Sequence, residues 1–139
     1  MTLFLLDTDH LTLLERGHAR VLKNVVSHAT DPIAICVITV IEQLEGWQGA
    51  LHQAKQDSKR ELIYRQIAHT VESLSSWPVL TYTVPAMARR RALLRMRLNV
   101  GSNDLKIAAI ALEHQATVVT RNIRDFARIP GLAYVDWTI

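Results

Sequence analysis

Five short apolar runs, separated by longer segments of helical pattern, are the feature of this 139-residue chain that most limits its fold. Four runs predict strands, at residues 3–6, 33–37, 79–83 and 117–120, of which the first two are expected to be buried. A fifth strand at residues 133–135 is expected at the sheet edge. Between these runs, apolar residues recur at helical spacing. Strands that alternate with helices favour an α/β sandwich in which helices flank a mostly parallel central sheet.

Capping residues and helix breakers predict where the helices begin and end. The first helix is expected over residues 9–16, because Asp and Thr cap helices well and Gly17 breaks the pattern. Thr39 is expected to cap another helix, with Glu42 at the third position of a capping box. The remaining helices are predicted at residues 18–29, as one or two long segments within 50–77, from Pro85 to Leu98, and from Asp104 after a turn at 99–103.

Length and composition indicate one globular domain spanning residues 1–139. Apolar residues make up 49% and charged residues 21% of the chain, which is typical of a compact fold. No apolar stretch reaches membrane-spanning length, and none resembles a secretory signal, so we expect a cytoplasmic protein. The only cysteine, Cys36, lies in a β-branched run, which predicts a buried core side chain and no disulfide.

Four acidic residues stand where a predicted strand ends or a predicted helix begins: Asp7, Glu42, Asp104 and Asp125. In a parallel sheet the carboxyl ends of the strands meet at one edge, so we expect these side chains to gather in one crevice. Gathered carboxylates repel one another unless protons or cations neutralise them. Oxygen ligands favour Mg²⁺ or Mn²⁺ over Zn²⁺, and no pair of Cys or His has zinc spacing.

Each acid also has a purely structural interpretation. Asp7 and Asp104 could be helix caps, Glu42 could serve only its capping box, and Asp125 could cap the short segment before Phe126. The metal hypothesis differs because it requires all four acids to lie at one edge of the sheet.

Small polar residues at the same strand ends could orient the carboxylates or hold metal-bound water, or could serve only as caps and turns. They are Thr39, Thr120 and Asn122. Two further acids, Asp9 and Glu45, are not expected to join the site. His10 could reach the site in a supporting role, but a position on a helix surface is the expectation.

The charge pattern favours a polyanionic substrate. The chain has 16 Lys and Arg residues against 13 Asp and Glu, for a net charge of +3, although four of those acids are assigned to one crevice. Most of the bases are arginine, whose planar fork suits phosphate oxygens. The arginines predicted to contact RNA, or alternatively only to solvate a helix or pair with a partner's acids, are Arg89, Arg90, Arg91, Arg95, Arg97 and Arg121.

Four blocks of this sequence, taken in order, resemble the VapC-type PIN-domain ribonuclease toxins. They are Leu-Leu-Asp-Thr-Asp at residues 5–9, Ile-Thr-Val-Ile-Glu at 38–42 followed by Gly46, Asn-Asp-Leu-x-Ile-Ala-Ala from Asn103, and the stretch from Val119 to Leu132. Each block alone is a weak signal, whereas their order and spacing together are specific. The likeness extends over nearly the whole chain.

The resemblance implies a PIN-like three-layer sandwich and a Mg²⁺- or Mn²⁺-dependent endoribonuclease that cuts structured RNA such as tRNA or rRNA. It also implies a homodimer, and a cognate antitoxin protein whose tail enters the active-site groove. Asp7, Glu42 and Asp104 match the three core acids of the family. The family places its fourth acid where Asn122 or Asp125 stands, and here the first is an amide. Asp9 departs from the family, in which many relatives have Asn.

Two other functions compete with the ribonuclease hypothesis. A haloacid-dehalogenase-like phosphatase also begins with a strand followed by Asp-x-Asp, but it needs a later Lys and a paired acidic motif, and Lys106 with Asp104 is a poor match. A catalytically silent PIN module would bind RNA or a protein partner without cutting. Metal-dependent cleavage that is lost with EDTA and with substitution of Asp7 distinguishes the enzyme from the silent module.

Overall fold

A five-stranded sheet forms the centre of the protein in the computed structural model, which describes residues 1–139, and all of its neighbouring strands are parallel. The strands are β1 (Phe4–Leu6), β2 (Ile33–Cys36), β3 (Val79–Leu80), β4 (Thr117–Val119) and β5 (Ala133–Val135). Their order across the sheet is β3-β2-β1-β4-β5, so β1 lies in the middle and β5 at one edge. The predicted α/β class and the edge position of the last strand are confirmed.

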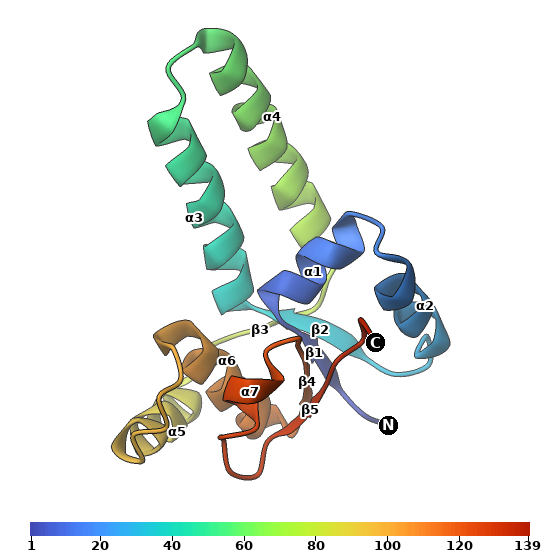
Figure 1. Cartoon of the computed structure of the whole chain (residues 1–139), viewed down its shortest axis with the longest axis vertical. Coiled ribbons are helices and arrows are strands. Elements are labelled where there is room, and N and C mark those ends of the chain that lie inside the picture. Colours follow the sequence, from blue (N-terminus) through green and yellow to red (C-terminus); the bar gives the residue numbers. More distant parts are fainter.

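Seven helices connect or follow these strands. They are α1 (Thr8–Glu15), α2 (Ala19–Ser27), α3 (Val37–Gln53), α4 (Asp57–Leu74), α5 (Val84–Arg95), α6 (Ser102–His114) and α7 (Ile123–Phe126). Helices α1 and α2 lie on one side of the sheet, and α5 and α6 pack together on the other (Figure 1). The expected three-layer arrangement is therefore present.

Successive side chains of β1 point to opposite faces of the sheet, and each face has its own apolar core. Leu5 belongs to the cluster beneath α5 and α6, which includes Ile107 and Phe126. Phe4 and Leu6 point to the other face, where they join the cluster that contains Leu11 and Trp137. All three β1 residues are buried, which explains why this strand is a continuous apolar run rather than an alternating one.

Several element boundaries differ from those predicted. Helix α3 begins at Val37 directly after β2 and its N-cap is Cys36, so the prediction that Thr39 caps this helix in a capping box was wrong. The strand predicted at 79–83 ends at Leu80, because Thr83 instead caps α5 through a hydrogen bond from the Ala86 N–H. The polar stretch at 50–77 contains the end of α3 and the whole of α4.

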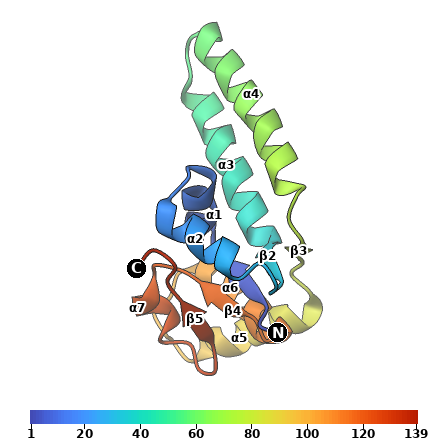
Figure 2. The ribbon, with the colours of Figure 1, turned by 90° about the vertical axis from the view of Figure 1, so that its right-hand side faces the viewer.

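Helices α3 and α4 form a long hairpin that projects away from the sheet (Figures 1 and 2). The two helices pack along each other, and Trp47 of α3 donates its indole N–H to the Thr70 hydroxyl of α4 over 2.8 Å. None of the helices has both the length and the apolar character needed to cross a bilayer.

The order of the strands creates a crevice at the carboxyl edge of the sheet. The chain adds β2 and β3 on one side of β1, and then β4 and β5 on the other. A reversal of this kind separates the connections that follow the two central strands and opens a space between them. Asp7 follows β1 and Thr120 follows β4, so residues at this reversal point are the first candidates for a functional site.

Replacing Leu5 by Ala should lower the free energy of unfolding by about 2–5 kcal/mol, because the substitution leaves a cavity in the middle of the sheet. Leu5 has no exposed surface. Urea denaturation of the purified chain measures the effect. Leu62→Ala is the matched control, because this side chain is 53% exposed and should change the unfolding free energy by only about 0.5 kcal/mol. Equal losses in both variants would contradict the assignment of the core.

Candidate functional site

Asp7 lies at the start of the crevice, where the central strand passes into α1. It is the N-cap of α1, and its Oδ1 accepts a hydrogen bond of 2.8 Å from the backbone N–H of His10. Its own backbone N–H donates to the Val119 carbonyl of β4, which fixes the residue between the two central strands. The capping interpretation is therefore correct for Asp7, and it also places the carboxylate at the reversal point.

A single amide joins two of the other predicted acids. The Nδ2 of Asn122 lies 3.0 Å from Oδ2 of Asp104 and 3.0 Å from Oδ2 of Asp125. A side-chain amide has two N–H donors, so one serves each carboxylate. Asn122 presents a donor to these acids, and we infer that Asp125 is the acid that accompanies Asp104.

Glu42 reaches the crevice from α3 and is oriented by a residue that the sequence interpretation missed. The Thr8 hydroxyl donates to Oε1 of Glu42 over 2.7 Å and lies 3.1 Å from the Thr39 hydroxyl. Thr39 is fully buried and therefore supports Glu42 through Thr8 rather than directly. Thr120 is equally buried and accepts a hydrogen bond from the Asn122 backbone N–H, which is a turn contact.

Electrostatic interactions connect all four predicted acids. Burial raises the pKa of the Asp104 carboxyl, and the charges of Asp7, Glu42 and Asp125 raise it further. The hydrogen bond from Asn122 opposes these effects without cancelling them. Three acids from separate elements thus act on Asp104 at the carboxyl edge of the sheet, and a cation there would relieve both the repulsion and the desolvation.

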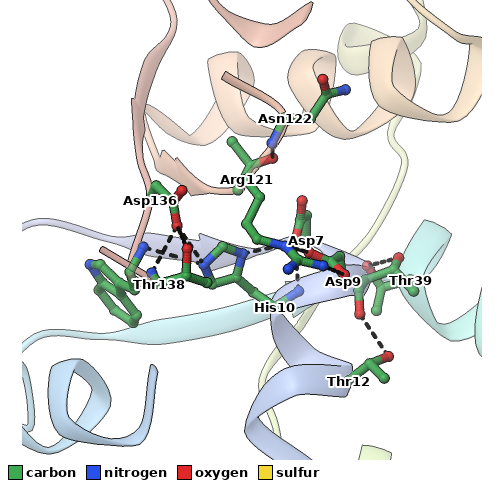
Figure 3. A network of polar contacts seen from close by, with 12 residues as sticks. Asp7, Asp9, His10, Thr12, Thr39, Arg121, Asn122, Asp136 and Thr138 are labelled. Carbon is green, nitrogen blue, oxygen red and sulfur yellow. Dashed lines mark hydrogen bonds and ion pairs between the residues drawn. The ribbon is translucent and has the colours of Figure 1, made fainter. Parts of the chain in front are cut away.

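Arg121 forms an ion pair with Asp9 of the same chain. Its Nε and one terminal nitrogen lie 2.7 and 2.8 Å from the two carboxylate oxygens of Asp9, in the two-pronged geometry that Arg forms with carboxylates (Figure 3). Asp9 raises the pKa of Arg121. The negative charge of Asp9 is therefore paired with a neighbouring base.

The remaining predicted arginines belong to α5 and the turn after it. Arg89 pairs with Glu113 of α6 over 2.6 Å, and Arg90 donates to the Ser102 hydroxyl over 3.2 Å. Arg91, Arg95 and Arg97 are exposed. None of the five makes a hydrogen bond or an ion pair with the four crevice acids, so the structure does not unite the arginine group with the acidic site.

Arg128 contacts the acidic site although it was not singled out in the sequence. One terminal nitrogen lies 3.4 Å from Oδ1 of Asp125 and 3.0 Å from the Asn99 carbonyl. It therefore ties the segment after α7 to the turn before α6. Asn99 and Arg97 both have positive φ, of 59° and 52°, so this turn holds two strained residues close to Asp104 in the chain.

His10 is also placed differently from the prediction. It was expected on a helix surface, but its side chain has no exposed area. The ring lies between Asp7 and the residues that follow β5 (Figure 3). One ligand atom each from Asp7, Asp9 and His10 lie within 4.8 Å of one another, which makes this trio a second possible metal-binding group.

A groove of about 800 Å³ runs from the crevice along the α3–α4 hairpin. Thr8 and Glu42 line its end nearest the acids, and Trp47 and Thr70 line it farther along the hairpin. Residues of α1 complete its wall. The candidate site is thus continuous with a larger concave surface that could accommodate part of a macromolecule.

Replacing Asp104 by Asn should stabilise the metal-free protein at neutral pH. The folded state raises the pKa of this carboxyl above its ordinary value of 3.8, so ionised Asp104 destabilises the fold at neutral pH. This penalty declines as pH falls through the raised pKa and disappears below 3.8. Thermal melting in EDTA should therefore show a higher Tm for Asp104→Asn at pH 7 and equal Tm values at about pH 3. Lower stability of the variant at pH 7 would contradict this electrostatic assignment.

Comparison with known proteins gives a consistent family and fold. Residues 4–132 match the PIN domain family. The chain is 25% identical to ribonuclease VapC1 of Haemophilus influenzae over 143 residues, which cover 98% of each chain. It is 28% identical to the tRNA(fMet)-specific endonuclease VapC of Salmonella typhimurium over 141 residues, which cover 99% of each chain.

Two solved structures have the same architecture over nearly their whole length. One is DNA-bound VapBC from Salmonella typhimurium, with a TM-score of 0.78, 29% identity and coverage of 99% of both chains. The other is VapBC-1 from nontypeable Haemophilus influenzae, with a TM-score of 0.73, 26% identity and coverage of 99% and 100%. The family match spans almost all of the sequence and includes the four acids of the crevice. The chain therefore belongs to the PIN domain family.

Proposed function

We propose that this chain is a Mg²⁺- or Mn²⁺-dependent endoribonuclease and the toxin of a toxin–antitoxin pair. The observation that supports this best is the interaction of acids from four separate elements at the carboxyl edge of the sheet. The relatives named as ribonucleases or as a tRNA endonuclease align with this chain over nearly its full length. Their names support RNA as the substrate class.

The residues at the crevice fit a divalent cation. Asp7, Glu42, Asp104 and Asp125 supply only carboxylate oxygens, the donors that Mg²⁺ and Mn²⁺ prefer. Burial raises the pKa of Asp104 and the charges of the other three acids raise it further, so a cation would favour the ionised form of this carboxyl. A bound divalent ion would supply charge neutralisation at the phosphodiester and acidify the attacking water.

The surrounding side chains are arranged to hold these acids in place. Asn122 fixes Asp104 and Asp125 relative to each other, and Thr8 orients Glu42. Water is the expected nucleophile, because Cys36 is fully buried and burial raises the pKa of its thiol. Hydrolysis of a phosphodiester at this site is expected to leave a 5′ phosphate on one product.

The phosphatase alternative is not supported. It would need the second acid of Asp-x-Asp to be free for proton transfer, whereas Asp9 is held by both prongs of Arg121. The silent-module alternative retains one specific observation in its favour, since an amide occupies one of the two positions where the family places its fourth acid. Direct assay of cleavage decides between the silent module and the enzyme.

Replacing Asp7 by Asn should lower RNA cleavage by at least about 100-fold, the order seen when one electrostatic group of an active site is lost. Asn caps helices as well as Asp, so α1 and the fold should be retained. The assay uses purified chain, structured RNA and Mg²⁺, with EDTA expected to stop cleavage and excess Mg²⁺ to restore it. Glu61→Gln is the control, because this acid lies on α4 with a side chain that is 73% exposed. Wild-type activity in Asp7→Asn would refute the assignment.

Induction of the chain in bacteria should arrest growth, and co-expression with the product of the neighbouring gene should relieve the arrest. Solved relatives include VapBC from Salmonella typhimurium and a toxin–antitoxin complex from Klebsiella pneumoniae, which supports a protein partner of this type. Mapping of new RNA ends in the arrested cells would identify the target. Arrest by the Asp7→Asn variant at equal expression would show that toxicity does not depend on cleavage. The homodimer implied by the resemblance stays a prediction.

A further inference from the structure

His10 makes a contact at each of its ring nitrogens, although it has no exposed surface. Nδ1 lies 3.3 Å from Oδ1 of Asp7, on the side of the proposed metal site. On the opposite side, the backbone N–H of Trp137 donates to Nε2 over 3.3 Å. Figure 3 shows the imidazole between Asp7 and the segment that follows β5. The ring thus connects the first strand to residues near the other end of the sequence.

The contact with Trp137 determines which nitrogen carries the proton. A backbone N–H can only donate, so Nε2 must present its lone pair and the proton must lie on Nδ1. Nδ1–H then points at Oδ1 of Asp7, which also accepts the backbone N–H of His10. With two donors on Oδ1, Oδ2 is the oxygen of Asp7 that no hydrogen bond occupies.

Trp137 is itself firmly anchored. Its carbonyl accepts a hydrogen bond of 3.1 Å from Asn24 of α2, and its indole stacks on His28 with ring centroids 4.9 Å apart. Phe4 of β1 packs against the same indole, also at 4.9 Å. The residue is only 2% exposed. The donor that faces His10 therefore has a fixed position.

Asp136 lies on the same side of the ring as Trp137. Its Oδ1 is 3.6 Å from Nε2 of His10. The same oxygen accepts hydrogen bonds from both the backbone N–H and the hydroxyl of Thr138, at 2.8 and 2.6 Å. Asp136 is thus satisfied within its own turn, and the shorter contact to Nε2 is that of the Trp137 N–H.

We propose that His10 is a positioning residue that holds Asp7 in the orientation needed to bind a cation, with Trp137 fixing the tautomer of its ring. This inference rests on the proposed metal-dependent function. It differs from a role for His10 as a ligand within the Asp7, Asp9 and His10 trio. The lone pair of Nε2 faces a backbone donor, Nδ1 carries the proton, and Arg121 occupies Asp9. Buried partners of this kind typically orient metal-binding side chains.

Two amide substitutions separate the functions of the two ring nitrogens. In His10→Asn the side-chain amide can place an N–H near the position of Nδ1 and retain the donor to Asp7. In His10→Gln the amide carbonyl can lie near the position of Nε2 and retain the acceptor for Trp137. We expect His10→Gln to weaken Mn²⁺ binding roughly 10- to 100-fold and His10→Asn to weaken it by less than about threefold.

Mn²⁺ titration of the purified chain, followed by electron paramagnetic resonance, measures these affinities without reference to RNA cleavage. Thermal melting in EDTA reports the effect of each variant on the fold alone. A purely structural role would lower the melting temperature of both variants and leave the Mn²⁺ affinity unchanged. Equal affinity in wild type and His10→Gln would overturn the positioning role while leaving the proposed function intact. No Mn²⁺ binding by the wild type would overturn both.

Two spectroscopic measurements on the wild type keep the inference testable if a variant does not fold. Long-range ¹H–¹⁵N correlation spectra should show His10 protonated at Nδ1 and not at Nε2. Electron spin echo modulation of the Mn²⁺ complex should show no directly coordinated imidazole nitrogen from His10. A proton on Nε2, or a strongly coupled ¹⁴N signal from a coordinated imidazole, would overturn the assignment.

Discussion

Parallel pairing of β1 with both β2 and β4 is the constraint on which the site depends. It places the carboxyl end of the first strand between two neighbours whose chains continue in different directions. Asp7 sits at that end, and the Val119 carbonyl of β4 accepts its backbone N–H. From this position, α3, α6 and α7 can each direct one acid toward the same space. A different neighbour for β1 would disperse the four acids over the surface.

The four carboxylates repel one another in this arrangement, and their short hydrogen bonds offset the repulsion only in part. Asn122 donates to two carboxylates, Thr8 to a third, and Arg128 lies beside Asp125. Arg121 neutralises Asp9 at the rim of the crevice. The pKa of Asp104 nevertheless stays raised, first by burial and then by the charges of the other three acids, so a cation would stabilise its ionised form. The ionised carboxylates therefore make the folded protein less stable than it would be if every charge were paired. Such unpaired charge is common at sites that bind a ligand.

The ends of the predicted elements made the four acids predictable, because Asp7, Glu42 and Asp125 come after apolar runs and Asp104 begins a predicted helix. The order of the strands was not predictable, since local patterns contain no information on which strands pair. The capping box at Thr39 failed because β2 passes into α3 without a connecting loop. Thr8 was missed because its partners, Thr39 and Glu42, lie far away in sequence. The burial of His10 was not predicted because it depends on the distant segment that contains Trp137.

The pairing of β1 with β4 has a consequence for biosynthesis. Phe4 aligns with Thr117, so the middle strand lacks one of its two neighbours until most of the chain has left the ribosome. Contacts between such distant residues form late, because closing a long loop reduces chain entropy before any contact compensates for it. A partly synthesised chain therefore has no assembled crevice. The four acids, and any cation site that they form, can therefore come together only after the segment that contains β4 has been synthesised.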